Sequence, residues 1–135
     1  MDKLYIPGDL VIVKTEPNNH LPKGGVCEFV SYCNRNKVFV RVAKGIDTLF
    51  LEKEQITPIP LTPEILEKNG WKNDGYDWYR LPTKRAYLYI TKDITTLGEF
   101  LVCVGLDRHN LASINFVHQL QHLLFGLNIN SEMEV

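Results

Sequence analysis

The chain has 135 residues, of which 44% are hydrophobic and 23% are charged, a composition typical of a folded domain and not of a disordered segment. Its 15 lysines and arginines are balanced by 16 aspartates and glutamates. The resulting net charge of −1 gives no general attraction to a phosphate backbone or an anionic membrane.

Membrane spans and disulfides are not expected. The first residues, M-D-K-L-Y-I-P-G-D, lack the features of a signal peptide, and no apolar run reaches the ~20 residues that cross a bilayer. We therefore expect a cytoplasmic protein. Its cysteines, Cys27, Cys33 and Cys103, include no C-x-x-C pair, which argues against a disulfide framework or a cysteine-rich zinc site. Cys27 and Cys33 share one alternating apolar segment and are expected to be buried thiols.

The first half of the chain predicts short β-strands. β-Branched and aromatic runs bounded by turn residues occur at 10–14, 25–33, 37–42 and 48–52. So few short antiparallel strands cannot bury both faces of an open sheet. We therefore predict an SH3-like small β-barrel over residues 1–58.

Residues 56–71, I-T-P-I-P-L-T-P-E-I-L-E-K-N-G-W, interrupt this pattern. Pro58 and Pro60 are expected to break any strand and to mark a domain boundary. A helix of about two turns should follow, since the segment supplies an N-cap residue, a proline at the first helical position and a glycine just past the end: Thr62, Pro63 and Gly70.

The second half, residues 59–135, predicts a helix, an antiparallel meander and a second helix. After W-K and a turn around 73–75, strand patterns occur at 77–81, 86–90 and 99–104. Residues 115–127, N-F-V-H-Q-L-Q-H-L-L-F-G-L, read as the final helix. The predicted fold class is therefore α+β, with two domains.

These segments resemble a group of small uncharacterised proteins from Bacteroides-type genomes, prophages and mobile elements. The group's pattern runs L-T-x-E-x-L-x-x-x-G-F, then V-H-x-L-Q-N-L-Y-F-x-L, then T-G-x-E-L, and it matches the C-terminal half better than the first half. This chain departs from it at Trp71 in place of phenylalanine, at His122 in place of asparagine, and in I-N-S-E-M-E-V where the others have T-G-x-E-L. The resemblance implies a shared fold and a phage or mobile-element origin, and it supplies no activity.

His118 and His122 have the spacing of the histidines in H-E-x-x-H, but Gln119 stands where a metalloprotease needs its glutamate. The apolar stripe Phe116, Val117, Leu120, Leu123, Leu124 and Leu127 lies on the opposite side of the helical projection, so we expect both histidines to lie outside the core. A metal would need further ligands, for which only His109, Cys103 and Asp107 are near in sequence. We expect no metal, and expect Gln119 and Gln121 to hydrogen-bond loop backbone.

No motif predicts catalysis or nucleotide binding. The chain contains neither G-x-S-x-G nor a glycine-rich phosphate loop. We therefore expect a protein that is not an enzyme and that carries no cofactor.

The most suggestive surface segment is W-Y-R-L-P-T-K-R-A-Y-L-Y-I-T-K at 78–92, which interleaves aromatic and basic residues. Such a hairpin can bind single-stranded nucleic acid, and the candidate residues are Trp78, Arg80, Lys84, Arg85, Tyr87 and Tyr89. The alternative is that alternate aromatics are core and the cations form a solvated turn. With a near-neutral charge, we predict a binding or assembly module with a protein partner, and nucleic-acid binding as the alternative function. The sequence does not determine an oligomeric state.

Overall fold

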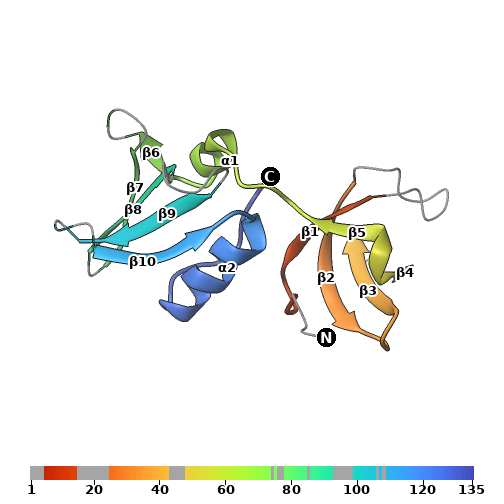
Figure 1. Ribbon diagram of the computed structural model, residues 1–135. Coiled ribbons are helices and arrows are strands. Elements are labelled where there is room, and N and C mark those ends of the chain that lie inside the picture. Colours follow the sequence, from red (N-terminus) through yellow and green to blue (C-terminus); the bar gives the residue numbers. More distant parts are fainter. Residues whose placement is uncertain are drawn as a thin grey trace. The chain divides into compact units, whose positions relative to one another are not determined.

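A computed structural model describes residues 5–14, 25–42, 48–73, 75, 78–84, 86–92, 99–105, 107 and 109–135. The chain divides into two compact units, Met1–Ile59 and Pro60–Val135 (Figure 1). The sequence places the boundary after residue 58. Four predicted features lie wholly or partly outside the described residues: the turn residues that precede the 25–33 strand, the turn around 73–75, the start of the 77–81 strand, and Arg85.

The first unit is a five-stranded antiparallel sheet with the strand order β4-β3-β2-β1-β5. The first four strands confirm the four predicted from the β-branched and aromatic runs, with small differences at the ends. The strands are β1 (Leu10–Val13), β2 (Val26–Tyr32), β3 (Lys37–Val42), β4 (Thr48–Glu52) and β5 (Ile56–Pro58), with a 3₁₀ turn, η1 (Lys53–Gln55), between the last two.

The fifth strand corrects the prediction that Pro58 breaks any strand. Pro58 ends β5, which pairs with β1 in the register Val11 to Pro58 and Val13 to Ile56. β5 is an edge strand of the sheet. A proline is tolerated there because its missing N–H removes no hydrogen bond when it faces away from the neighbouring strand.

The core of the first unit lies on one face of this sheet. Val38 and Val40 are fully buried while their neighbours Phe39 and Arg41 are partly exposed, so the side chains of β3 alternate between a core face and a partly exposed face. The remaining core residues are Tyr5, Val11, Val13, Cys27, Phe29, Leu51 and Ile56. Among the described residues no pairing joins β4 to β5, so the SH3-like barrel stays a prediction.

The cysteines of this unit differ. Cys27 is buried as predicted, but Cys33 is exposed, because it follows the last residue of β2 and lies in the turn to β3. Burial raises the pKa of the Cys27 thiol from 9.0 to about 11.

This pKa predicts alkaline destabilisation of the first unit. Between about pH 9 and about pH 11 the folded state keeps the Cys27 proton and the unfolded chain releases it, so the free energy of unfolding falls as pH rises. The stabilising contribution of the protonated Cys27 thiol is fully present below about pH 9. Urea unfolding at several pH values from about 8 to about 10.5 should show a smaller loss for Cys27→Ala than for the wild type. Cys33→Ala, at the exposed cysteine, should retain the wild-type loss, and equal slopes for the two variants would contradict this assignment.

The second unit is an antiparallel sheet of order β10-β9-β8-β7-β6 with two helices. Its elements are α1 (Pro63–Lys68), β6 (Lys72–Asn73), β7 (Trp78–Pro82), β8 (Tyr87–Lys92), β9 (Phe100–Val104), β10 (His109–Ile114) and α2 (Val117–Gly126). This arrangement confirms the α+β class. Strand β10 was not predicted, because it is a largely exposed edge strand whose polar residues and bulge after Asn110 hide the two-residue alternation.

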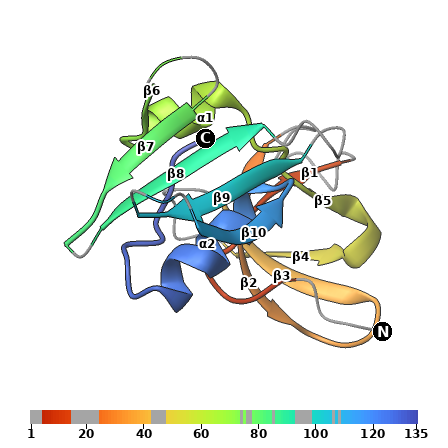
Figure 2. The same ribbon diagram turned by 60° about the vertical axis from the view of Figure 1, so that its left-hand side comes forward.

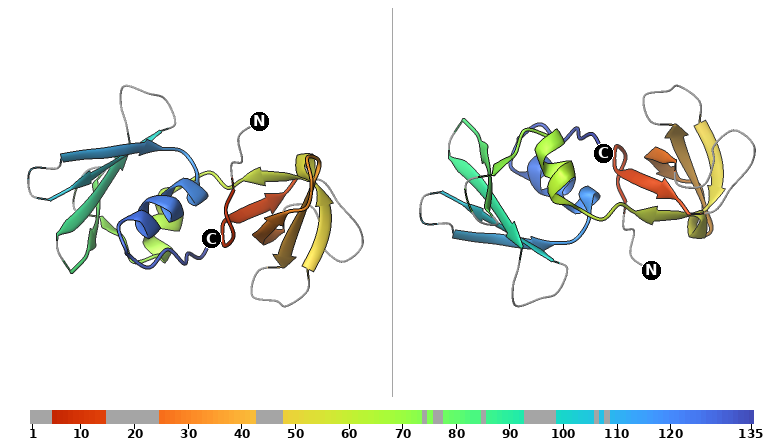
Figure 3. Two further views of the ribbon diagram at one scale, coloured as in Figure 1. Left: turned by 90° about the horizontal axis from the view of Figure 1, so that it is seen from below. Right: turned by 90° about the horizontal axis from the view of Figure 1, so that it is seen from above.

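Both helices lie on the same side of this sheet (Figure 3), and Figure 2 shows the strands side by side in front of α1. Thr62 caps α1 as predicted, since its Oγ1 accepts a hydrogen bond from the Ile65 amide at 3.2 Å. Gly70 has a φ of +89°, the left-handed conformation expected just past a helix end. The helix residues Leu66, Val117, Leu120 and Leu124 are buried with Trp71.

Candidate functional site

The register of the second sheet decides which side chains share a face. Directly paired residues point to the same side, and neighbours along a strand alternate. Leu81 pairs with Leu88, and Leu88 pairs with Val104; Leu88 and Val104 line a pocket with residues that follow α2. This is therefore the face that the helices cover. Arg80, Tyr89 and Cys103, which also pair in a row, lie on the opposite face.

We call that opposite side the open face, because no helix among the described residues lies on it. Four of the predicted binding residues share it: Trp78 and Arg80 on β7, and Tyr87 and Tyr89 on β8. The ring centroids of Trp78 and Tyr89 are 6.2 Å apart in an edge-on arrangement, and those of Tyr87 and Tyr89 are 6.3 Å apart. The Arg80 guanidinium lies over the Tyr87 ring at 5.0 Å, in cation–π geometry.

These four side chains differ in exposure. Tyr87 is 42% exposed, and Trp78 and Arg80 are partly exposed. Tyr89 is buried, as is Cys103 beside it, whose thiol donates to Asn110 Oδ1 at 3.3 Å. The buried Tyr89 ring therefore packs against Trp78 and Tyr87. The other three side chains, Trp78, Arg80 and Tyr87, are exposed enough to contact a partner.

The other two predicted binding residues do not join this group. Lys84 lines a pocket on the helix-covered side together with Leu88, so it belongs to the other face of the unit. Arg85 lies outside the described residues. The interleaved pattern of the sequence predicted all six residues as one group, and it says nothing about the direction of side chains in the hairpin turn.

The described strand positions of the open face carry a small positive charge. Lys72 of β6 pairs directly with Arg80 and so lies on the same side. No described strand position on this face holds a carboxylate, and the positions around the aromatic group are Thr91, Leu101, Asn110 and Ser113. The described part of this face therefore has an aromatic centre, two cations and a mainly polar border.

Comparisons with family models, curated proteins and solved structures found no match for this chain. A function must therefore be argued from the described residues themselves. No helix among them is long and apolar enough to cross a membrane.

The histidine pair of α2 corrects one prediction. His118 is buried, and its ring stacks on Phe116 with centroids 5.9 Å apart. His122 is partly exposed, with its ring centroid 5.5 Å from that of His118. The helical projection placed His118 outside the core. In the structure Phe116 packs beside His118 at the start of the helix, whereas Leu127, at the other end of the predicted apolar stripe, is exposed. Among the described residues, no group of three His, Cys, Asp or Glu side chains could hold a metal ion.

The glutamines of α2 have the role that was predicted for them. The amides of Asn115 and Phe116 donate to Gln119 Oε1 at 2.7 and 3.0 Å, which satisfies backbone donors at the helix start. Gln121 Nε2 donates to the Ser131 carbonyl at 3.3 Å and so fixes the segment after the helix. The H-Q-L-Q stretch is therefore explained by structural hydrogen bonds.

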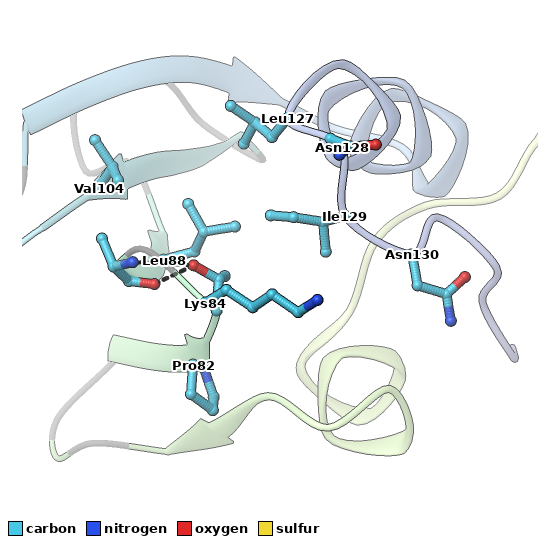
Figure 4. Close-up of a pocket in the computed structure, with 10 residues that line it drawn as sticks. Pro82, Lys84, Leu88, Val104, Leu127, Asn128, Ile129 and Asn130 are labelled. Atoms are coloured by element: carbon cyan, nitrogen blue, oxygen red, sulfur yellow. Dashed lines mark hydrogen bonds between the residues drawn. The ribbon is translucent and has the colours of Figure 1, made fainter.

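A pocket of about 810 Å³ lies on the helix-covered side of the sheet, where the β7–β8 hairpin faces the residues after α2 (Figure 4). Its floor includes Leu88 and Val104, and its far wall includes Leu127 and Ile129. Sequence reasoning missed it, because its walls come from segments about forty residues apart whose approach depends on the strand order. The one signal in the sequence was the apolar pair Leu127 and Ile129, at the last residue of the predicted helix and two residues beyond it.

Proposed function

We propose that the protein is a non-enzymatic, cytoplasmic binding or assembly module whose open face contacts a protein partner. One observation carries the proposal: Trp78, Arg80 and Tyr87 lie together on a sheet face that no described helix covers. Tryptophan, arginine and tyrosine are the residues most enriched among the energetic hot spots of protein interfaces. An aromatic centre with a polar border is also the usual arrangement of an interface.

The small positive charge at the described positions of the open face favours a protein partner over a nucleic acid. A ligand that contacts the two cations of the open face, Lys72 and Arg80, could release about two counterions. For a single strand this gives a salt slope of only about −1.4, too small for electrostatics alone to hold the strand at physiological salt. In addition, Tyr89 is buried, so it offers no free ring face on which a base could stack.

For the first unit we propose that the sheet curls into an SH3-like barrel. Two observations support this: β1 joins the β2–β3–β4 meander to β5, and β2 carries a register shift between Phe29 and Ser31. A bulge of this kind bends a strand and increases its twist, as a small barrel requires.

Photocrosslinking tests the role of the open face. A p-benzoylphenylalanine at position 87 should crosslink a specific protein in cells of the native host. The matched control is position 50, since Phe50 is 51% exposed on the first unit. Arg80→Ala and Trp78→Ala should each reduce the crosslinked product, because each removes a hot-spot side chain beside Tyr87. No product at position 87, or the same products at both positions, would contradict the proposal.

Fluorescence anisotropy with labelled single strands tests the alternative function. At moderate salt we expect either no binding or binding that the Arg80→Ala substitution leaves unchanged. Salt-sensitive binding that is lost in Arg80→Ala but kept in Lys68→Ala, an exposed lysine of α1, would replace the protein partner with nucleic acid.

A further inference from the structure

The pocket beneath the β7–β8 hairpin is built on hydrogen-bonded walls. In the hairpin, the Thr83 amide donates to the Ala86 carbonyl at 3.1 Å, and the Ala86 amide donates to Thr83 Oγ1 at 3.1 Å. Opposite, the Ile129 amide donates to the Leu124 carbonyl at 2.8 Å. Asn128, with a φ of 60°, makes the turn that redirects the chain, a conformation that asparagine tolerates better than most residues. The backbone of both walls is therefore held by hydrogen bonds within each segment, which lowers the entropic cost of ordering them around a ligand.

The inside of this pocket is mainly apolar. Leu88 forms a buried floor at 2% exposure, and Val104 and Ile129 are partly buried beside it. Leu127 at the rim leaves 41% of its side chain exposed, so apolar surface here is not covered by any described part of the chain. Covering it would be favourable by about 25 cal/mol for each Å² removed from water. The volume of about 810 Å³ lies within the range of small-molecule sites.

One cation stands at this apolar surface. Figure 4 shows the Lys84 side chain extending from the hairpin toward Ile129. Lys84 forms no ion pair with any described residue. The described lining contains no carboxylate, and its other polar side chains are neutral: Thr83, Asn128 and Asn130. The charge of the pocket is therefore complementary to an anion, and its body is complementary to an apolar group.

We propose that this pocket binds a small amphipathic carboxylate, with its apolar chain against Val104, Leu127 and Ile129 and its carboxylate beside Lys84. The chain would cover the exposed rim residue Leu127. The site lies on the helix-covered side of the sheet, opposite Trp78 and Tyr87. It is thus independent of the partner surface on the open face.

Decanoate is the probe that tests this site, with decyltrimethylammonium as its oppositely charged counterpart. Titration of decanoate into the full chain should shift the NMR methyl signals of Leu88, Val104, Leu127 and Ile129. Lys84→Met keeps most of the apolar stem and removes the charge, and should weaken decanoate binding about two- to five-fold. Lys68→Met, at an exposed lysine of α1 outside the pocket, is the matched control and should bind as the wild type does.

The Ala86→Trp variant tests where the ligand binds. Ala86 lines the pocket, and it takes part in the hairpin hydrogen bonds only through its own backbone atoms, so changing its side chain removes none of them. The variant should weaken decanoate binding more than ten-fold, and its amide spectrum shows whether it is folded. Three results would overturn the proposal: no methyl shifts at millimolar decanoate, equal affinity for decyltrimethylammonium, or unchanged binding in a folded Ala86→Trp. Tyr87→Ser, which alters the open face, should leave decanoate binding unchanged and so separates this site from the proposed partner surface.

Discussion

Replacing Phe29 with alanine should lower the free energy of unfolding of the first unit by about 3–5 kcal/mol. Phe29 is 1% exposed at the centre of the core, and its ring lies 5.5 Å from that of Tyr5 and 4.8 Å from that of Tyr32. Alanine would leave a cavity that these two rings cannot both fill. A unit of about sixty residues has a total stability on the order of 3–9 kcal/mol, so much of this unit should unfold.

Phe50→Ala is the matched control, because it makes the same chemical change at a side chain that is 51% exposed. Phe50 keeps a ring contact with Phe39 at 5.0 Å and lies under Lys37 Nζ at 5.3 Å, which together are worth about 1 kcal/mol. Amide hydrogen exchange in β2 measures the first unit alone. Equal loss of protection in the two variants would show that Phe29 does not occupy the core.

The strands that the sequence predicted are those in which burial produces a visible alternation. Val38 and Val40 are buried on β3 between partly exposed residues, so residues 37–42 were recognised with the right ends. β10 shows no such alternation, because both faces of its first half are exposed. β5 failed because a proline was taken to exclude a strand, although an edge position tolerates it.

The candidate sites show the same division between local and non-local information. Trp78, Arg80, Tyr87 and Tyr89 could be placed together because two adjacent strands have a period of two and a short hairpin fixes their register. Which of them a partner can reach was not predictable, since Tyr89 is buried by neighbours from two strands. The pocket at Lys84 was beyond sequence reasoning, because Leu127 and Ile129 approach the hairpin only through tertiary packing.

The helix α2 illustrates a limit of the helical projection. An ideal projection treats every turn alike, so it placed Leu127 in the core and His118 outside it. In the structure Val117 and His118 at the start are buried, while Phe125 and Leu127 at the end are exposed. The predicted stripe is right at Val117, Leu120 and Leu124, which are all buried, and wrong at Leu127, which is exposed.

Leu120→Ala should therefore destabilise the second unit by about 2–5 kcal/mol. Leu120 is fully buried in the middle of α2, where its side chain fills the core beneath the sheet. A short helix of this length is held mainly by such packing and only weakly by its own propensity, so the loss should loosen the whole helix. Both tryptophans, Trp71 and Trp78, belong to this unit, so urea unfolding followed by tryptophan fluorescence reports on it selectively.

Leu127→Ala makes the same deletion on the same predicted stripe at a side chain that is 41% exposed, and should cost less than about 1 kcal/mol. The pair separates the two descriptions of α2 directly. If the helix buried a uniform stripe, the two variants would lose similar stability; if burial ends before Leu127, only Leu120→Ala should shift the urea midpoint substantially. A large shift in Leu127→Ala would also mean that the rim of the pocket is closed in solution, which would remove the exposed apolar surface on which the carboxylate site depends.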